Sequence, residues 1–240
     1  MKKKLFYIVS IVLAFMVFGY AVFYFTAQLP KQKEREQLEN AMRAYYQSKI
    51  TLYEEENALY EDFEVDVAFL GDSLTDGYDL AQYYPQYKTA NRGIGGETTY
   101  GLKNRLEVSV YALKPKIAVL LIGGNNLNTM FEDYENILIG FQNHLPNTKI
   151  LLLSLTAMGK TLADKNVLAA YNNVKIEKLA EKYGFAFVDL FTPLFDLETG
   201  EIHSSYTTDG AHLTAHGYQV LTDAITPALT QLMESFENSI

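Results

Sequence analysis

The sequence predicts an α/β fold of three layers, in which a parallel sheet lies between two layers of helices. From residue 65 onward, short apolar runs alternate with longer helix-like segments. Such alternation indicates a parallel sheet with helices on both faces. About 180 residues belong to this part, which is an ordinary size for one domain. A separate apolar run at the N-terminus predicts a transmembrane helix ahead of that domain.

The strands and helices of this domain follow from the same alternation. Short apolar runs predict strands at residues 65–70, 88–90, 117–122, 150–155 and 185–188. Longer segments of helix formers with helical spacing predict helices at residues 100–113, 132–141, 162–183 and 214–236. Gly184 directly follows the third helix, as a residue that ends a helix in the left-handed conformation would.

The N-terminus indicates a membrane anchor. Residues 1–4 form a basic tip with three lysines, and residues 5–27 form an apolar run without any charge. A run of this length can span the hydrocarbon core of a bilayer. Lysines on its N-terminal side place residues 1–4 in the cytoplasm and the rest of the chain outside. The alternative is a cleaved signal peptide with a small-residue site near residues 19–21, but signal-peptide apolar cores are usually shorter.

Residues 28–62 are expected to form a helical juxtamembrane linker, and residues 63–240 the α/β domain. The linker begins with charged helix formers, followed by apolar residues at a loose helical spacing. Its heptads are too short and irregular for a coiled coil, so we expect it to pack onto its own domain. The sequence leaves the oligomeric state open.

The composition excludes several classes of protein. The chain has no cysteine, which rules out disulfides, thiolate metal sites and a lipid-modified cysteine anchor. It carries 20 basic and 29 acidic residues, and the first 30 residues hold three lysines and no acid. The remainder therefore has a net charge of −12, which argues against nucleic acid as a partner.

Three residues suggest nucleophilic acyl chemistry. Ser73 follows an apolar strand, while Asp209 and His212 lie three residues apart near the C-terminus. On one helical turn, residues at this spacing share a face, so the carboxylate can orient the imidazole. A serine hydroxyl needs such a base to become a good nucleophile. The alternative is that Ser73 merely caps the next helix; the lipase-type G-x-S-x-G elbow is not matched, because Thr75 replaces its second glycine.

Two further segments can supply hydrogen-bond donors for an oxyanion. A glycine-dense stretch at residues 91–99 contains Gly96, and Gly123-Gly124-Asn125-Asn126 follows a second apolar strand. A glycine lets its backbone N–H approach a ligand closely, and an Asn side chain offers a neutral N–H donor. The alternatives are a tight turn or phosphate loop for the glycines and an ordinary turn for Asn125.

These motifs, in this order, resemble the four sequence blocks of the SGNH (GDSL) hydrolases. The blocks are Gly71-Asp72-Ser73, Gly96, Asn125 and the pair Asp209/His212. The resemblance runs from about residue 65 to the C-terminus, and the stretch 91–99 resembles the platelet-activating-factor acetylhydrolase-like branch. The family implies a flavodoxin-like SGNH hydrolase fold.

The resemblance also implies roles for these residues. Ser73 matches the nucleophile, His212 the general base and Asp209 the residue that orients it. The oxyanion hole would combine the backbone N–H groups of Ser73 and Gly96 with the side chain of Asn125. The family commonly has Asp after that Asn, and this chain departs from the pattern because Asn126 stands there.

The remaining histidines suggest little chemistry. His216 lies four residues past His212, a spacing that two metal ligands on a helix can share. The Glu of the H-E-x-x-H motif is absent, and the serine blocks already explain Asp209 and His212, so we expect no metal site and no cofactor. His144 is expected on a surface loop, and His203 precedes a polar stretch.

The sequence therefore predicts a membrane-anchored, extracytoplasmic serine esterase that cleaves small acyl esters through an acyl-enzyme. Its substrate would be a small acyl ester linked to a glycan or a lipid. Two alternatives stay open. One is an acyltransferase that uses the same triad on surface glycans, and the other is a non-catalytic carbohydrate-binding module, for which 18 tyrosines supply stacking surfaces.

Overall fold

The structure is a computed structural model that describes residues 2–239. The chain divides into two compact units, Met1–Lys49 and Ile50–Ile240. The first unit is helical throughout the residues described, and the second contains the sheet and the candidate site.

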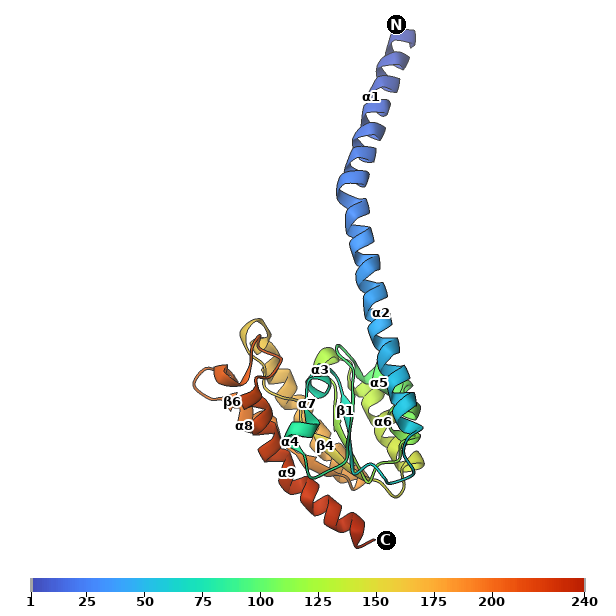
Figure 1. Cartoon of the computed structure of the whole chain (residues 1–240). Helices are drawn as coiled ribbons and strands as arrows, with labels where there is room; N and C mark the ends of the chain where they lie inside the picture. The colour runs from blue at the N-terminus through green and yellow to red at the C-terminus, as the bar shows by residue number, and fades with distance from the viewer. Residues whose placement is uncertain (1, 240) are drawn as a thin grey trace. The chain divides into compact units, whose positions relative to one another are not determined.

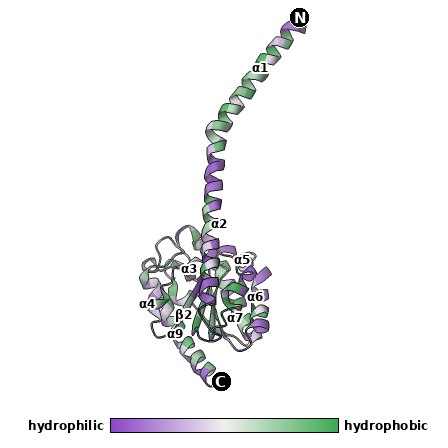
Figure 2. Ribbon diagram, turned by 45° about the vertical axis from the view of Figure 1, so that its right-hand side comes forward, coloured by the Kyte–Doolittle hydropathy of each residue, from purple (hydrophilic) through white to green (hydrophobic). Residues whose placement is uncertain are grey.

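The first unit consists of α1 (Lys2–Phe23), a π-helical turn (Tyr24–Gln28) and the first part of α2 (Leu29–Asn57). Figure 2 shows mainly hydrophobic residues along α1 after its first turn and mainly hydrophilic residues along α2. Among the residues described, the continuous helix Lys3–Asn57 is the one helix that is long and apolar enough to cross a membrane, judged by length and composition. A signal sequence would share those two properties.

The second unit contains a five-stranded parallel sheet, as predicted. The strands are β1 (Val67–Gly71), β2 (Thr89–Gly93), β3 (Ile117–Leu121), β4 (Lys149–Leu153) and β5 (Ala186–Val188). Their order is β2-β1-β3-β4-β5, and every neighbouring pair is parallel. This is the flavodoxin-like order, which reverses direction between β1 and β3. Ligands of such sheets bind beyond the carboxyl ends of the strands at that reversal.

Helices cover both faces of the sheet (Figures 1 and 2). One face packs against α5 (Thr99–Asn104), α6 (Phe131–His144) and α7 (Asn166–Tyr183), and the other against α4 (Leu80–Tyr83), α8 (Phe191–Leu194) and α9 (Ala215–Glu237). Residues of β1 alternate between the two cores: Ala68 and Leu70 face the first, while Val67 and Phe69 face the second. Both faces of the strand are buried, which explains why its sequence is continuously apolar.

Three of the predicted elements differ from the structure. The helix expected at 100–113 is broken, because α5 ends at Asn104 and a π-helical turn (Glu107–Tyr111) follows. The helix expected at 162–183 begins with a 3₁₀ turn (Lys160–Lys165) before α7. The strand expected at 88–90 begins at Thr89 and continues to Gly93, and it contains the buried side chain of Arg92.

Arg105, at the break after α5, joins the ends of the first two strands. Its buried guanidinium donates from Nε to Glu97 Oε2 at 2.9 Å. It also donates from Nη1 to the carbonyl oxygen of Arg92 at 3.0 Å and from Nη2 to that of Gly71 at 3.1 Å. One side chain therefore fixes the carboxyl ends of β1 and β2 and the loop that follows β2.

The last turns of α2 belong to this unit and contact the same region. The hydroxyl of Tyr53 donates to the carbonyl oxygen of Gly93 at 2.6 Å. Arg92 pairs with Glu56 and donates to Asn57 Oδ1 at 3.1 Å. The C-terminal end of the segment expected as a linker thus packs within the second unit.

We expect Arg105→Gln to destabilise the second unit by about 3–5 kcal/mol, because it leaves the buried carboxylate of Glu97 without its charge partner. The measurement is urea unfolding of the full chain in detergent, followed by the near-ultraviolet circular dichroism of the tyrosines. Lys182→Gln is the matched control: it breaks an ion pair with Glu135 whose partners are both exposed, and should cost less than about 1 kcal/mol. Equal losses in the two variants would contradict the role given to Arg105.

Candidate active site

Ser73 lies just beyond the carboxyl end of β1, as its first position in α3 (Ser73–Asp76). Asp72, and not Ser73, caps this short helix, because its Oδ1 accepts a hydrogen bond from the backbone N–H of Leu74 at 3.1 Å. The hydroxyl of Ser73 is therefore not needed for capping.

Asp209 and His212 lie in a loop, not on the helical turn expected from their spacing. A β-bridge between Thr207 and Leu213 closes the loop. Oδ1 of Asp209 accepts hydrogen bonds from the backbone N–H groups of Ala211 (2.9 Å) and His212 (2.8 Å). The two side chains still meet, because the carboxylate folds back over the loop in the way that Asx turns do.

The structure brings Ser73, His212 and Asp209 into one chain of contacts. His212 Nδ1 lies 2.7 Å from Asp209 Oδ2, and His212 Nε2 lies 3.1 Å from Ser73 Oγ. With the ring proton on Nδ1 and donated to the carboxylate, Nε2 is free to accept the hydroxyl proton. The side chains of His212 and Asp209 are 55% and 54% exposed, so water reaches the imidazole.

Two carboxylates near the serine have shifted pKa values in opposite directions. The hydrogen bond from the His212 side chain, with those from the two backbone N–H groups, holds the pKa of Asp209 well below its usual range. Burial raises the pKa of Asp72 from about 3.8 to about 6. Asp209 therefore carries a full negative charge at neutral pH, and Asp72 changes its charge in mildly acidic solution.

Asn125 lies beyond the carboxyl end of β3, in the 3₁₀ turn Gly124–Asn126. Gly123 before it has a φ of +119°, a conformation that side chains rarely adopt. Nδ2 of Asn125 donates to the carbonyl oxygen of Glu97 at 2.9 Å and lies 3.5 Å from Asp72 Oδ2. The side chain of Asn126 donates to Thr99 Oγ1 at 2.9 Å, so this position ties the turn to the start of α5.

Gly96 lies in the loop after β2 with a φ of +76° and is exposed. Its backbone N–H has no hydrogen-bond partner among the residues described. It is not among the residues that line the cavity at Ser73. Gly96 therefore lies outside the lining of this cavity. It directly precedes Glu97, whose carbonyl oxygen accepts the hydrogen bond from Asn125.

The cavity at Ser73 has a volume of about 400 Å³. Ser73, Asn125, Asp209 and His212 all line it, and its apolar part is formed by Leu74, Met158 and Leu162. Such a volume is within the range of small-molecule sites.

Tyr218 in α9 holds the segment of His212 against that of Ser73. Its hydroxyl donates to the carbonyl oxygen of Leu74 at 2.9 Å, and its ring stacks on Tyr78 with centroids 4.8 Å apart. The hydrophobic spacing of α9 predicts that Tyr218 faces inward, but not that its hydroxyl bonds to the turn of Ser73. Arg105 and Glu97 were missed for a similar reason, since charged residues in a helix-like stretch are usually solvated.

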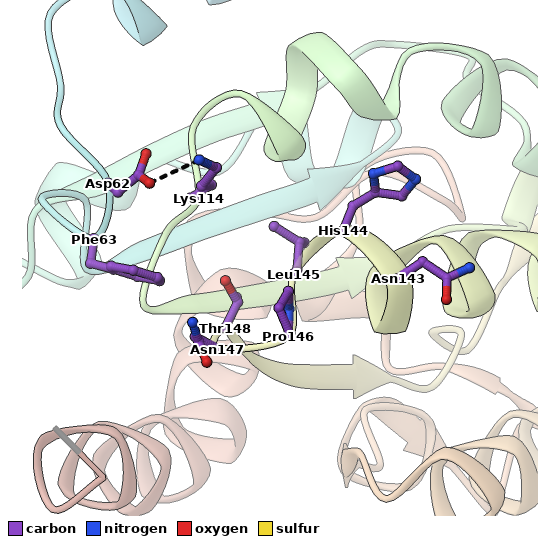
Figure 3. Close-up of a pocket in the computed structure, with 9 residues that line it drawn as sticks. All are labelled: Asp62, Phe63, Lys114, Asn143, His144, Leu145, Pro146, Asn147 and Thr148. Carbon is purple, nitrogen blue, oxygen red and sulfur yellow. Dashed lines mark hydrogen bonds and ion pairs between the residues drawn. The ribbon is translucent and has the colours of Figure 1, made fainter.

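A second cavity of about 410 Å³ lies at the opposite edge of the sheet, beside the segments that enter β1, β3 and β4 (Figure 3). It contains His144, which ends α6 and stacks on Tyr111 instead of lying on a loop as expected. The two cavities are similar in volume, but no serine lines this one. His203 pairs with Ser205 at 2.8 Å, and His216 packs edge-on against Tyr206. Across residues 2–239, no cluster of three or more His, Cys, Asp or Glu side chains forms a metal site.

Solved structures with the same fold carry related names. A protein from Streptococcus pneumonia, provisionally described as a platelet activating factor, is 27% identical; the match covers 82% of this chain and 99% of that one, with a TM-score of 0.67. A GDSL-like lipase from Bacteroides thetaiotaomicron is 23% identical over 76% of this chain and 97% of its own, with a TM-score of 0.68. An acetylxylan esterase from Geobacillus stearothermophilus is 19% identical; the match covers 70% of this chain and 95% of that one, with a TM-score of 0.59. The last two show a common fold only.

No curated protein matches the chain. Residues 69–220 match the GDSL-like Lipase/Acylhydrolase family, and this segment is more than half of the chain. It begins within β1 and ends after the loop of Asp209 and His212. The chain therefore belongs to the GDSL-like lipase/acylhydrolase family, and it is an ester hydrolase.

Proposed function

We propose that this protein is a membrane-anchored, extracytoplasmic serine esterase in which Ser73, His212 and Asp209 form the catalytic triad. The observation that carries the proposal is the chain of contacts from Ser73 Oγ through the imidazole to Asp209, inside a cavity at the carboxyl edge of the sheet. A serine beside a base that is itself oriented by a carboxylate is the arrangement that activates a hydroxyl.

The reaction then follows from the positions of these groups. His212 Nε2 takes the proton of Ser73 as Oγ bonds to the ester carbonyl carbon. The tetrahedral intermediate collapses, the bond from carbon to the alcohol oxygen breaks, and the imidazolium returns its proton to the leaving alcohol. Water, activated by the same imidazole, then attacks the acyl-enzyme and releases the acid. Asp209 stays ionised throughout and stabilises the imidazolium.

The negative oxygen of the intermediate needs fixed donors. We assign these to the backbone N–H groups of Ser73 and Gly96 and to Nδ2 of Asn125. The unpaired N–H of Gly96 and the hydrogen bond that orients Asn125 support this assignment. Each such donor typically contributes roughly 3–4 kcal/mol to the transition state.

Hydrolysis is favoured over acyl transfer by the exposure of the base. Because more than half of the His212 side chain is open to solvent, water has direct access to the acyl-enzyme. Acyl transfer would require an acceptor to displace that water. A purely carbohydrate-binding module is disfavoured because it would have no physical need for the aligned base and carboxylate.

We also propose that α1 anchors the enzyme and that the catalytic unit lies outside the cytoplasm. The uncharged apolar run and the lysines before it support this topology. Expressed in a bacterial cell, the chain should sediment with membranes, resist extraction with carbonate and keep its N-terminal residues by mass spectrometry. A soluble product shortened near residue 21 would instead show that the segment is a signal peptide.

Removing the triad should abolish ester hydrolysis without unfolding the protein. Ser73→Ala and His212→Ala should lower kcat for p-nitrophenyl acetate by roughly four to six orders of magnitude, and Asp209→Asn by about four. Ser205→Ala is the matched control, because Ser205 also contacts a histidine, His203, but lies outside the cavity. Retained activity in Ser73→Ala would refute the assignment of the nucleophile.

The raised pKa of Asp72 predicts a pH-dependent stability. The folded protein holds the Asp72 proton up to about pH 6, whereas the unfolded chain releases it near pH 4. Stability should therefore fall as the pH rises through this window, by up to about 3 kcal/mol, and then level off. Asp72→Asn removes this contribution; any change in packing adds an offset that does not depend on pH.

The measurement is the free energy of unfolding of both proteins at intervals from pH 4 to 7. The free energy of unfolding of Asp72→Asn minus that of the parent should increase between pH 4 and 6. A constant difference across that range would show that Asp72 is not protonated in the folded state.

A further inference from the structure

The cavity at Ser73 continues into a groove along α7. A hollow of about 370 Å³ shares Gly124, Asn125 and Lys165 with that cavity. A further hollow of about 410 Å³ shares Asn128, Thr129 and Leu168 with the second. Each hollow is about as large as the cavity of the nucleophile, so the three together exceed what a small acyl ester requires.

One face of α7 forms the floor of this groove. Leu168, Tyr171 and Lys175 are spaced three and four residues apart, which places them on the same side of the helix. They cover about 10 Å of the helix axis, the length of a short oligosaccharide. The opposite wall comes from the turn after β3, residues 127–129, and from the start of α6.

The most exposed side chains of this groove are polar or aromatic. Tyr171 is 71% exposed, and Asn128, Thr129 and Lys165 are also exposed. The apolar side chains are less exposed: Leu127 is buried, Leu168 and Phe131 are half-buried, and the ammonium group of Lys175 lies 3.8 Å from the centre of the Phe131 ring. Glu132 adds a single negative charge beside the two lysines.

This lining suits a sugar chain and not a hydrocarbon chain. Burying an acyl chain here would remove ammonium, amide and hydroxyl groups from water without giving them partners, which is costly. Sugar hydroxyls both donate and accept hydrogen bonds, and the C–H face of a sugar ring can pack on the electron-rich face of an exposed tyrosine.

We propose that the groove binds the glycan part of an O-acylated oligosaccharide. The esterified sugar lies at Ser73, and the adjoining sugars extend over residues 124–129 onto Tyr171. This inference rests on the proposed esterase function and specifies the class of alcohol that the enzyme releases. Tyr171 is then a specificity-determining residue that touches the substrate but not the reacting atoms.

The test compares esters of different length with the full-length enzyme in detergent. The substrates are p-nitrophenyl acetate and O-acetylated cello-oligosaccharides of one, two and five sugars, with lysophosphatidylcholine as the lipid ester. We expect kcat/KM to increase with the number of sugars. Tyr171→Ala should lower the value for the pentasaccharide by about three- to tenfold, mainly through KM, and leave p-nitrophenyl acetate hydrolysis unchanged. Tyr171→Phe should restore most of the loss.

Tyr100→Ala is the matched control. Tyr100 is 62% exposed and has Lys103 over its ring, much as Tyr171 has Lys175 nearby on its helix, but it is not among the groove residues. It should leave every substrate unaffected. Binding of the unacetylated pentasaccharide to Ser73→Ala, with and without Tyr171→Ala, measures the groove independently of catalysis.

The outcomes separate the two proposals. Hydrolysis of p-nitrophenyl acetate with no dependence on chain length and no effect of Tyr171→Ala would overturn the glycan groove but keep the esterase. A higher kcat/KM for lysophosphatidylcholine that falls in Tyr171→Ala would overturn it in favour of a lipid. A folded enzyme that hydrolyses none of these esters would overturn the proposed function itself, and the groove would lose its basis.

Discussion

The geometry of the candidate site depends on the buried guanidinium of Arg105. It donates hydrogen bonds to carbonyl oxygens at the ends of β1 and β2 and to the carboxylate of Glu97 at the same time. The first of these carbonyls belongs to Gly71, two residues before Ser73. The backbone of Glu97, in turn, accepts the hydrogen bond that orients Asn125. A single cation thus fixes the serine turn relative to the donors that are proposed to hold the oxyanion.

The other half of the site is held by a different kind of contact. Asp209 and His212 lie on a loop closed by the bridge between Thr207 and Leu213, and Tyr218 connects the following helix to the serine turn. This half is open to solvent, whereas the Arg105 half is buried. The division suits the proposed roles: oxyanion donors should not reorganise during the reaction, and a general base should exchange protons with water.

The parallel sheet and the residues at its carboxyl edge were predictable because each has a local signature. The continuous apolar runs of β1 and β3 are typical of strands buried on both faces, and Ser73 and Asn125 lie within four residues of their ends. The order β2-β1-β3 then brings the two residues together. Gly184 in the left-handed conformation at the end of α7 is a similarly local feature.

What the sequence did not predict depends on contacts between distant segments. From the sequence alone, Arg92 and Arg105 would be expected to face solvent. Their partners Glu56 and Glu97 come close to them only in the folded structure. The break in the helix after Asn104 has the same origin, since the chain leaves the helix to direct Arg105 inward. The pairing of Asp209 with His212 was anticipated for the wrong reason: their spacing suits a helical turn, but a loop brings them together.

The measurement that tests this account most directly is covalent labelling of the full-length protein in detergent with a fluorophosphonate, followed by mapping of the adduct by mass spectrometry. We expect one adduct, on Ser73, that forms slowly in His212→Gln and not at all in Ser73→Ala. A folded protein that forms no adduct, or one labelled at a serine outside the cavity, would contradict the account.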